Sequence, residues 1–241
     1  MRRTKIVATV GPSSTSPEVL GALIDAGANV FRLNFSHGTH EEHRQRAETI
    51  RQLATEKGVS VGLLGDLQGP KIRLRNLPGD SIALKKGQAV CLDTDLDDGE
   101  GNENHVGVGY EPLPQSVNEG DILLLDDGLF RFKVLRVEGN KVYCVSESSG
   151  TLKSRKGINR LGGGLSAPAL TEKDLEDIHC AAAIGLDYVA VSFPSNAGDI
   201  HYAREKLEAA GCFAQIVSKI ERAEAVADNE TLDAIILASD A

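Results

Sequence analysis

The first 66 residues alternate three times between β-type and helical patterns, and this alternation constrains the fold more than any other feature. The runs TKIVATVG (4–11), NVFRLNFS (29–36) and VSVGLLGD (59–66) are rich in apolar and β-branched residues, as strands are. Between them, apolar residues recur at helical spacing, and Gly27 and Gly58 stand where helices end. Three such steps in so short a stretch predict a parallel sheet with right-handed crossovers.

Helix starts are also marked in the sequence. Ser16 precedes a proline, a combination typical of a helix N-cap and first turn. Thr39 with Glu42, and Thr171 with Asp174, have the spacing of capping boxes, in which each side chain bonds the backbone of the other residue. We therefore expect helices to begin directly after these three positions.

The pattern changes from about Lys71 to Leu165. Short β-rich runs alternate there with turn residues, and Glu138–Asn140 is typical of a hairpin turn. No long helical stripe occurs, which predicts a small all-β domain inserted into the α/β one. The expected domains are 1–69 for the first part of a barrel, 70–165 for the inserted β lid, and 166–241 for the second part.

After the insert, the α/β pattern resumes. DYVAVSF (187–193) and FAQIVSKIE (213–221) are predicted strands, and Ser195 or Asn196 can cap the helix between them. LDAIILASDA (232–241) begins a sixth step. The predicted class is α/β: an incomplete (β/α)8 TIM-type barrel with about six strands, and an inserted small all-β barrel domain after strand three.

Composition excludes several function classes. The chain has 26 Lys and Arg against 35 Asp and Glu, a net charge of −9, which disfavours nonspecific nucleic-acid binding. It has no apolar run of about 18 residues and no secretory signal at its start, so neither a membrane span nor export is expected. The four cysteines lack a CxxC pair. This spacing favours reduced thiols in a cytoplasmic protein.

The second predicted strand has one apolar face and one polar face. Alternate side chains of a strand point the same way. One face therefore carries Phe31, Leu33 and Phe35, and the other carries Arg32, Asn34 and Ser36. The first face suits a core, and the second resembles a functional site.

Polar residues also end the other predicted strands. Asp66 and Gln68 end the third strand, Ser192 ends the fourth, and Lys219 and Glu221 end the fifth. In a (β/α)8 barrel, the chemistry lies at the carboxyl ends of the strands. A single serine or glutamine at a strand end is usually structural. So many ionisable groups at one end are costly to bury unless ligands or ions pair with them.

These residue types suit phosphoryl transfer. Arg32 offers a planar fork for phosphate, and Lys219 is a compact mobile cation. Glu221 is a hard oxygen ligand of the kind Mg²⁺ takes. Asn34, Ser36 and Asp66 form an oxygen-rich group suited to a monovalent or divalent cation. In phosphoryl transfer, positioning and charge neutralisation do most of the catalysis.

The runs TKIVATVGPSS, FRLNFSHGTHEEH, GDLQGPKIR, KGIN, LTEKDLEDI, VSFPSN and IVSKIE, in this order and spacing, resemble the pyruvate kinase family along the whole chain. The resemblance implies a barrel domain, a mobile lid and a C-terminal regulatory domain that this chain lacks, usually in a homotetramer. The implied reaction is phosphoryl transfer from phosphoenolpyruvate to ADP, giving pyruvate and ATP in the last step of glycolysis.

The resemblance also implies roles for individual residues. Arg32 resembles the arginine that contacts the transferring phosphate, and Lys219 resembles the lysine that stabilises the phosphoryl group in flight. Glu221 resembles one of two carboxylate ligands of the catalytic Mg²⁺. Residues implied on the nucleotide side are His37, Arg73 and Lys156.

A potassium site is implied as well. Asn34, Ser36, Asp66 and the backbone carbonyl of Leu67 resemble the family's K⁺ cage. Lys71 departs from the family pattern, because many members have glutamate there. Its ammonium could supply the charge that K⁺ supplies elsewhere. We therefore expect Mg²⁺ as cofactor, with K⁺ either bound in this cage or replaced by Lys71.

The chain ends at ASDA, where the family continues into a sixth strand that carries the second Mg²⁺ carboxylate. We therefore expect this polypeptide alone to be inactive and marginally folded, as part of a longer protein.

Three alternatives were weighed against this interpretation. The first is a metal-dependent, phosphoenolpyruvate-related lyase or aldolase barrel, which would not usually carry this insert. The second is a zinc hydrolase that uses His37, His40 and His43, whose spacing does not put three imidazoles on one helix side. The third is a non-catalytic, nucleotide-binding fragment.

Overall fold

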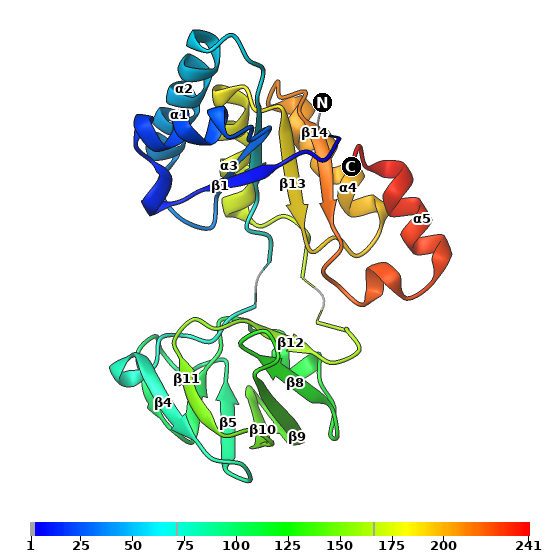
Figure 1. Ribbon diagram of the computed structural model, residues 1–241. Helices are drawn as coiled ribbons and strands as arrows, with labels where there is room; N and C mark the ends of the chain where they lie inside the picture. Colours follow the sequence, from blue (N-terminus) through cyan, green and yellow to red (C-terminus); the bar gives the residue numbers. More distant parts are fainter. Residues whose placement is uncertain (1–2, 71, 166) are drawn as a thin grey trace. The chain divides into compact units, whose positions relative to one another are not determined.

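The chain divides into two compact units. The computed structural model describes residues 3–70, 72–165 and 167–241. One unit comprises Met1–Pro70 with Pro168–Ala241, and the other comprises Lys71–Ala167 (Figure 1). Each unit has its own cluster of buried apolar side chains.

The first unit is built on a five-stranded parallel sheet. Its strands are β1 (Val7–Val10), β2 (Val30–Asn34), β3 (Gly62–Asp66), β13 (Tyr188–Ser192) and β14 (Gln215–Lys219). They lie side by side in chain order, and every neighbouring pair is parallel. This arrangement confirms the α/β prediction. The sheet is open in the described chain, with β1 and β14 at its edges.

In the described part of this unit, five α-helices accompany the sheet, and each contacts the next one along the chain. They are α1 (Pro17–Asp25), α2 (His40–Glu56), α3 (Glu172–Ile184), α4 (Ala197–Ala209) and α5 (Asn229–Ala238). The predicted cap at Ser16 and both predicted capping boxes are confirmed. Of the two candidate caps for α4, Asn196 is the one used.

The prediction of about six strands is wrong, because the described chain forms five in this sheet. The run 232–241 is mostly helix α5, whose cap Asp228 accepts a hydrogen bond from Thr231 N. A short apolar run does not by itself distinguish a strand from a buried helix. After the helix, the amides of Asp240 and Ala241 donate to the carbonyl of Ile216, so the chain returns beside β14.

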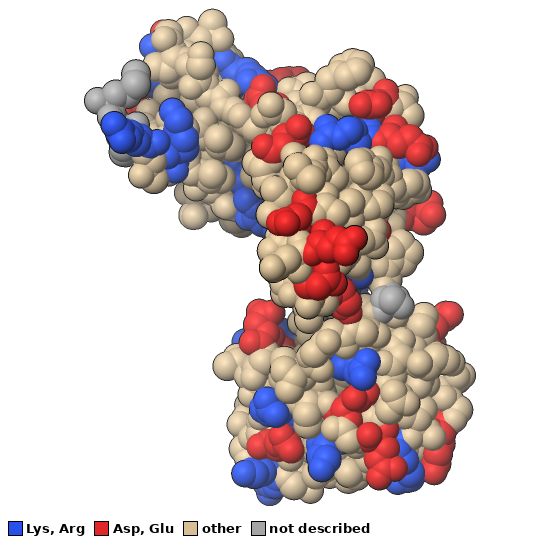
Figure 2. Space-filling view, turned by 90° about the vertical axis from the view of Figure 1, so that its right-hand side faces the viewer, with Lys and Arg blue, Asp and Glu red and all other residues tan. Residues whose placement is uncertain are grey.

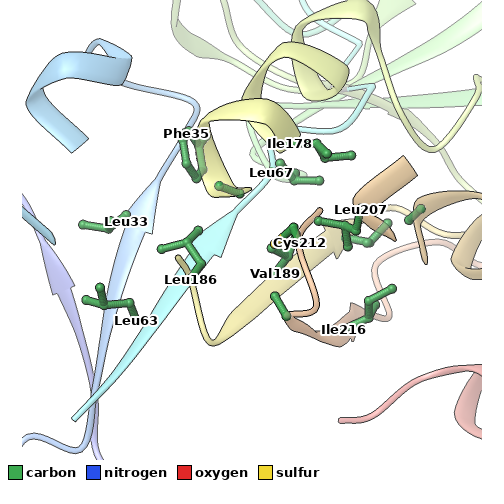
Figure 3. Close-up of a cluster of buried hydrophobic side chains, with 14 of the residues drawn as sticks. Leu33, Phe35, Leu63, Leu67, Ile178, Leu186, Val189, Leu207, Cys212 and Ile216 are labelled. Atoms are coloured by element: carbon green, nitrogen blue, oxygen red, sulfur yellow. The ribbon is translucent and has the colours of Figure 1, made fainter. Parts of the chain in front are cut away.

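The core of the first unit lies between the sheet and its helices. Figure 3 shows part of it: Leu33, Phe35, Leu63, Leu67, Ile178, Leu186, Val189, Leu207, Cys212 and Ile216. The predicted apolar face of the second strand is confirmed, since Phe31, Leu33 and Phe35 are all buried. The opposite face, with Arg32 and Asn34, is only partly buried.

The second unit consists of strands and short 3-10 turns, with no α-helix among its described residues. The strands of its larger sheet, in spatial order, are β12 (Ile158–Arg160), β8 (Ile122–Leu125), β9 (Phe130–Glu138), β10 (Lys141–Ser146), β5 (Ala89–Asp93), β7 (His105–Gly107) and β6 (Gly101–Asn102). Strands β11 (Gly150–Lys153) and β4 (Ser81–Leu84) form a second sheet. The predicted hairpin is present, because Glu138 and Lys141 are paired across a two-residue turn.

On the face shown in Figure 2, acidic and basic side chains both occur on each unit. Among the residues that the structure describes, no helix has the length and apolarity needed to cross a membrane.

Candidate functional site

The carboxylate of Asp66, at the end of β3, joins two cations that come from different strands. Arg32 on β2 donates from Nε to Asp66 Oδ2 at 2.6 Å, and its Nη2 lies 2.5 Å from the same oxygen. Lys219, the last residue of β14, places Nζ 3.2 Å from the other oxygen, Oδ1. Asp66 is only 3% exposed. The free-energy cost of burying this carboxylate is therefore offset by two cations, both of which are partly exposed to solvent.

Ser192, at the end of β13, completes this junction. Its hydroxyl donates to the carbonyl of Leu67 at 2.7 Å and accepts from Lys219 Nζ at 2.9 Å. It also lies 3.4 Å from Asp66 Oδ1. The sequence marks Ser192 only as a polar strand end, so its role at this site was missed. The missing information is the side-chain contact itself, which joins the Ser192 hydroxyl to the Leu67 carbonyl and to Lys219.

Thr9 on β1 was also missed. Its Oγ1 accepts a hydrogen bond from Arg32 Nη1 at 3.0 Å, and Thr9 is the register partner of Arg32. This contact orients the guanidinium from the side opposite Asp66 while leaving further N–H donors for a ligand. A threonine in a β-rich run gives no signal of such a role, because threonine is common in strands.

Glu221 lies two residues beyond Lys219 in the chain, a spacing that predicts that both side chains are on the same face. Its Oε1 is 3.5 Å from Lys219 Nζ, and its side chain is 34% exposed. The contact is long and partly solvated, so the carboxylate can rotate toward a ligand without leaving a buried cation unpaired.

The predicted oxygen-rich group also gathers at the ends of β2 and β3. Asn34 is the register partner of Asp66, and its Oδ1 accepts from Ser36 N at 3.0 Å. Leu67 buries its side chain in the core, so only its backbone can serve a site. Its carbonyl is already bound by Ser192.

The residues expected on the nucleotide side are not brought to this junction by any described contact. His37 is exposed, and its carbonyl accepts a hydrogen bond from the ring of His43 at 3.0 Å. Arg73 and Lys156 belong to the other unit. Lys71 lies outside the described residues.

Within the second unit, Arg73 and Lys156 are both held in place. Lys156 Nζ is 2.7 Å from Asp126 Oδ1, and Arg73 Nη1 donates to the carbonyl of Arg155 at 2.8 Å. Burial, followed by the neighbouring Arg155 charge, lowers the pKa of the Arg73 guanidinium.

The site suits a metal ion that shares its ligands with a substrate. Among the described residues, no group of three or more His, Cys, Asp or Glu side chains could hold a metal. Glu221 is one accessible carboxylate, and Mg²⁺ characteristically takes one or two carboxylates together with substrate oxygens and water. Arg32 and Lys219 balance Asp66 and Glu221 in formal charge. An anionic substrate would therefore need additional positive charge, which a divalent ion can supply.

The zinc alternative, which the histidine spacing already disfavours, gains no support from the described contacts. His40 Nε2 is 2.7 Å from Asp177, whereas His43 Nε2 contacts the His37 carbonyl. The two rings therefore serve different partners, and neither points to a shared ligand position.

Comparison with known proteins identifies the family. The family model described as pyruvate kinase, barrel domain, matches residues 1–241. This chain belongs to the pyruvate kinase family. It is 54% identical to the pyruvate kinase of Haemophilus influenzae over 240 residues and 53% identical to pyruvate kinase II of Salmonella typhimurium, covering 100% of this chain and 50% of each relative.

A solved structure agrees with this assignment. The crystal structure of a pyruvate kinase from Cryptosporidium parvum matches with a TM-score of 0.90 and 36% identity, covering 99% of this chain and 50% of that one. The chain thus spans about half the length of the pyruvate kinases it matches. Membership of the pyruvate kinase family leaves the lyase, aldolase and zinc hydrolase interpretations without support.

Proposed function

We propose that this chain forms the first half of a pyruvate kinase, and that the full-length enzyme transfers a phosphoryl group from phosphoenolpyruvate to ADP, giving pyruvate and ATP in the last step of glycolysis. The observation that carries the proposal is the meeting of Arg32 and Lys219 at the buried Asp66 carboxylate. Two cations at the ends of separate strands form a site for a phosphoryl group in flight.

The five strands are five of the eight strands of a (β/α)8 barrel. Their order along the sheet follows the chain without reversal. Right-handed crossovers that all advance in one direction place every helix on the same face, which is how a barrel is wound. The unit Lys71–Ala167 acts as the lid, and His37, Arg73 and Lys156 serve the nucleotide phosphates. The complete protein works as a cytoplasmic homotetramer.

Arg32 and Lys219 have different tasks in this reaction. Arg32 is fixed by Asp66 and Thr9, so its remaining N–H groups form a rigid donor set for the phosphate of phosphoenolpyruvate. Lys219 has a flexible stem and three ammonium donors, which suit a group whose position changes during transfer. Its contacts with Ser192, Asp66 and Glu221 hold it at the strand ends.

Two metal ions are part of the proposal. Glu221 would be one of the Mg²⁺ ligands, and bound Mg²⁺ neutralises phosphate charge and polarises phosphoryl oxygens. Asn34, Ser36, Asp66 and the Leu67 carbonyl would hold K⁺, unless Lys71 supplies that charge. Glu221 is the only carboxylate that this chain is proposed to contribute to Mg²⁺. The first half alone should therefore be inactive, and at most bind nucleotide.

The full-length enzyme with Lys219→Met tests the proposal. Methionine keeps the length of the side chain but removes its charge, so kcat should fall by about 10²–10³-fold while the protein remains folded. Lys206→Met is a matched control, because Lys206 pairs with the exposed Glu205 on α4. It should leave phosphoenolpyruvate-dependent ATP formation unchanged. Wild-type turnover in the Lys219 variant would show that another group stabilises the transferring phosphate.

A further inference from the structure

The buried carboxylate of Asp174, the third residue of α3, holds two separate stretches of backbone. Its Oδ2 accepts hydrogen bonds from Thr171 N at 2.8 Å and Thr171 Oγ1 at 2.6 Å. The first of these, together with the bond from Asp174 N to Thr171 Oγ1, forms the capping box. Its Oδ1 accepts a third bond, from Gly69 N at 3.1 Å. Helix capping requires only Oδ2. The bond to Gly69 therefore requires a separate explanation.

These two stretches are the ones through which the chain leaves and re-enters the parallel-sheet unit. The unit breaks off at Pro70 and resumes at Pro168. Gly69 directly precedes the first crossing, and Thr171 follows shortly after the second. One side chain thus fixes the chain on both sides of the inserted unit.

Gly69 also connects Asp174 to the site. It has a φ of 66°, and a Cβ at this position would lie 2.8 Å from Ser192 Cβ, so its backbone packs directly on Ser192. Phe193, which follows Ser192 in the chain, has a φ of 60°. This backbone conformation is unfavourable for an aromatic residue and persists only where the surrounding structure holds it in place. The Ser192 hydroxyl in turn binds the Leu67 carbonyl and Lys219. A shift of Gly69 would therefore displace both the Leu67 carbonyl and Lys219.

We propose that Asp174 is a positioning residue for the phosphoryl-transfer reaction. By holding Gly69 N, it fixes the loop 67–69 against Ser192, and through Ser192 it fixes Lys219. The inference rests on the proposed function, because Lys219 is the group through which Asp174 acts on the reaction.

The chemistry requires a carboxylate at this position. Each of the two oxygens accepts from a different stretch of backbone, and the first turn of α3 stabilises the negative charge. An amide has one accepting oxygen, and its nitrogen only donates. Asparagine can therefore accept from either Gly69 N or Thr171 N. The other N–H would then face the asparagine NH₂ group, which is itself a donor.

Asp174→Asn in the full-length enzyme tests this role. We expect kcat to fall by about 10- to 100-fold, as small displacements of catalytic groups do, with KM for phosphoenolpyruvate changing much less. Amide hydrogen exchange of a peptide spanning residues 65–70 should become about tenfold faster. Unchanged kcat together with unchanged exchange at Gly69 would overturn the proposal and leave Asp174 with capping alone.

Glu42→Gln is the matched control, because Glu42 occupies the same capping-box position in α2. It is exposed, its Oε2 accepts from Thr39 N at 2.7 Å, and its other oxygen lies 3.4 Å from Arg46 Nη2. A glutamine keeps the capping bond, so kcat should not change. A loss of kcat equal to that of Asp174→Asn would overturn the proposal, because general loosening of helix starts would then explain both.

Exchange in the unaltered enzyme gives a test that needs no variant. The Gly69 amide should exchange slowly although it lies in a loop, and fast exchange there would overturn the proposal. This measurement is independent of turnover. An enzyme that failed to transfer a phosphoryl group to ADP but protected Gly69 would refute the proposed function and the positioning role of Asp174 in it, while leaving the structural contact intact.

Discussion

At the scale of single residues, the described contacts already satisfy much of the oxygen group expected to hold K⁺. Each Asp66 oxygen faces a cation, Arg32 on one side and Lys219 on the other. The Asn34 amide oxygen accepts from Ser36 N, and the Leu67 carbonyl accepts from Ser192. The negative charge that would attract K⁺ is thus largely compensated by the protein itself.

This compensation supports the hypothesis that the enzyme works with little or no K⁺, and Lys71 is the cation proposed in its place. The full-length enzyme should keep most of its turnover in K⁺-free tetramethylammonium buffer, because under this hypothesis the Lys71 ammonium supplies the charge that K⁺ supplies elsewhere. Lys71→Glu, which restores the residue common in the family, should make turnover depend on added KCl. Steady-state rates with and without KCl measure both effects. If the unaltered enzyme lost turnover and recovered it with KCl, the hypothesis would be wrong.

The sequence predicts the charged residues of the site better than the neutral ones. Arg32, Asp66 and Lys219 stand out because charges at strand ends are costly to bury and therefore informative. Thr9 and Ser192 do not stand out, since small hydroxyl residues are common in strands. Their roles depend on which strands are neighbours and in which register, and only the folded sheet determines that.

At the scale of elements, local chemistry determines where helices begin but not always what a segment becomes. Side-chain caps act over three or four residues, so Ser16 and both capping boxes were predictable from the sequence. The run 232–241 was not, because its consecutive apolar residues fit a strand or a helix equally well. Asp228, which caps α5, lies before the run.

His43 on helix α2 should make the stability of the folded protein depend on pH. Its Nε2 donates to the His37 carbonyl, and its Nδ1 is buried with no hydrogen-bond partner among the described residues. Burial lowers the pKa of His43 from its usual 6.5. The charge of Arg46 adds to this shift, and the His37 carbonyl, Asp177 and Glu42 oppose it. The unfolded chain therefore binds the proton first as the pH falls.

The contribution of His43 to stability should be complete above about pH 6.5 and decline as the pH falls from there through the folded pKa. Melting temperatures of the full-length protein between pH 8 and pH 5 measure this decline. His43→Gln keeps an N–H donor for the His37 carbonyl and should flatten the curve below pH 6.5. Exposed His201, changed to glutamine, controls for the loss of a histidine. An identical curve for His43→Gln would contradict the expectation.

At the scale of the whole molecule, the two units have separate hydrophobic cores. Phe31 is fully buried in the parallel-sheet unit, and Phe132 is fully buried in the β unit. The β unit is also a single continuous stretch of chain, whereas the parallel-sheet unit is made of two segments. A continuous stretch with its own core meets the usual conditions for independent folding.

We therefore expect residues 71–167 alone to fold cooperatively, with an unfolding free energy of about 5 kcal/mol or more in urea. Phe132→Ala should lower it by about 3–5 kcal/mol, the usual cost of emptying a buried phenylalanine site. In the full-length protein, the matched Phe31→Ala should destabilise the parallel-sheet unit and leave the transition of the β unit unchanged. If Phe31→Ala shifted every transition equally, or if 71–167 lacked a cooperative transition by circular dichroism, the two cores would have to be one folding unit.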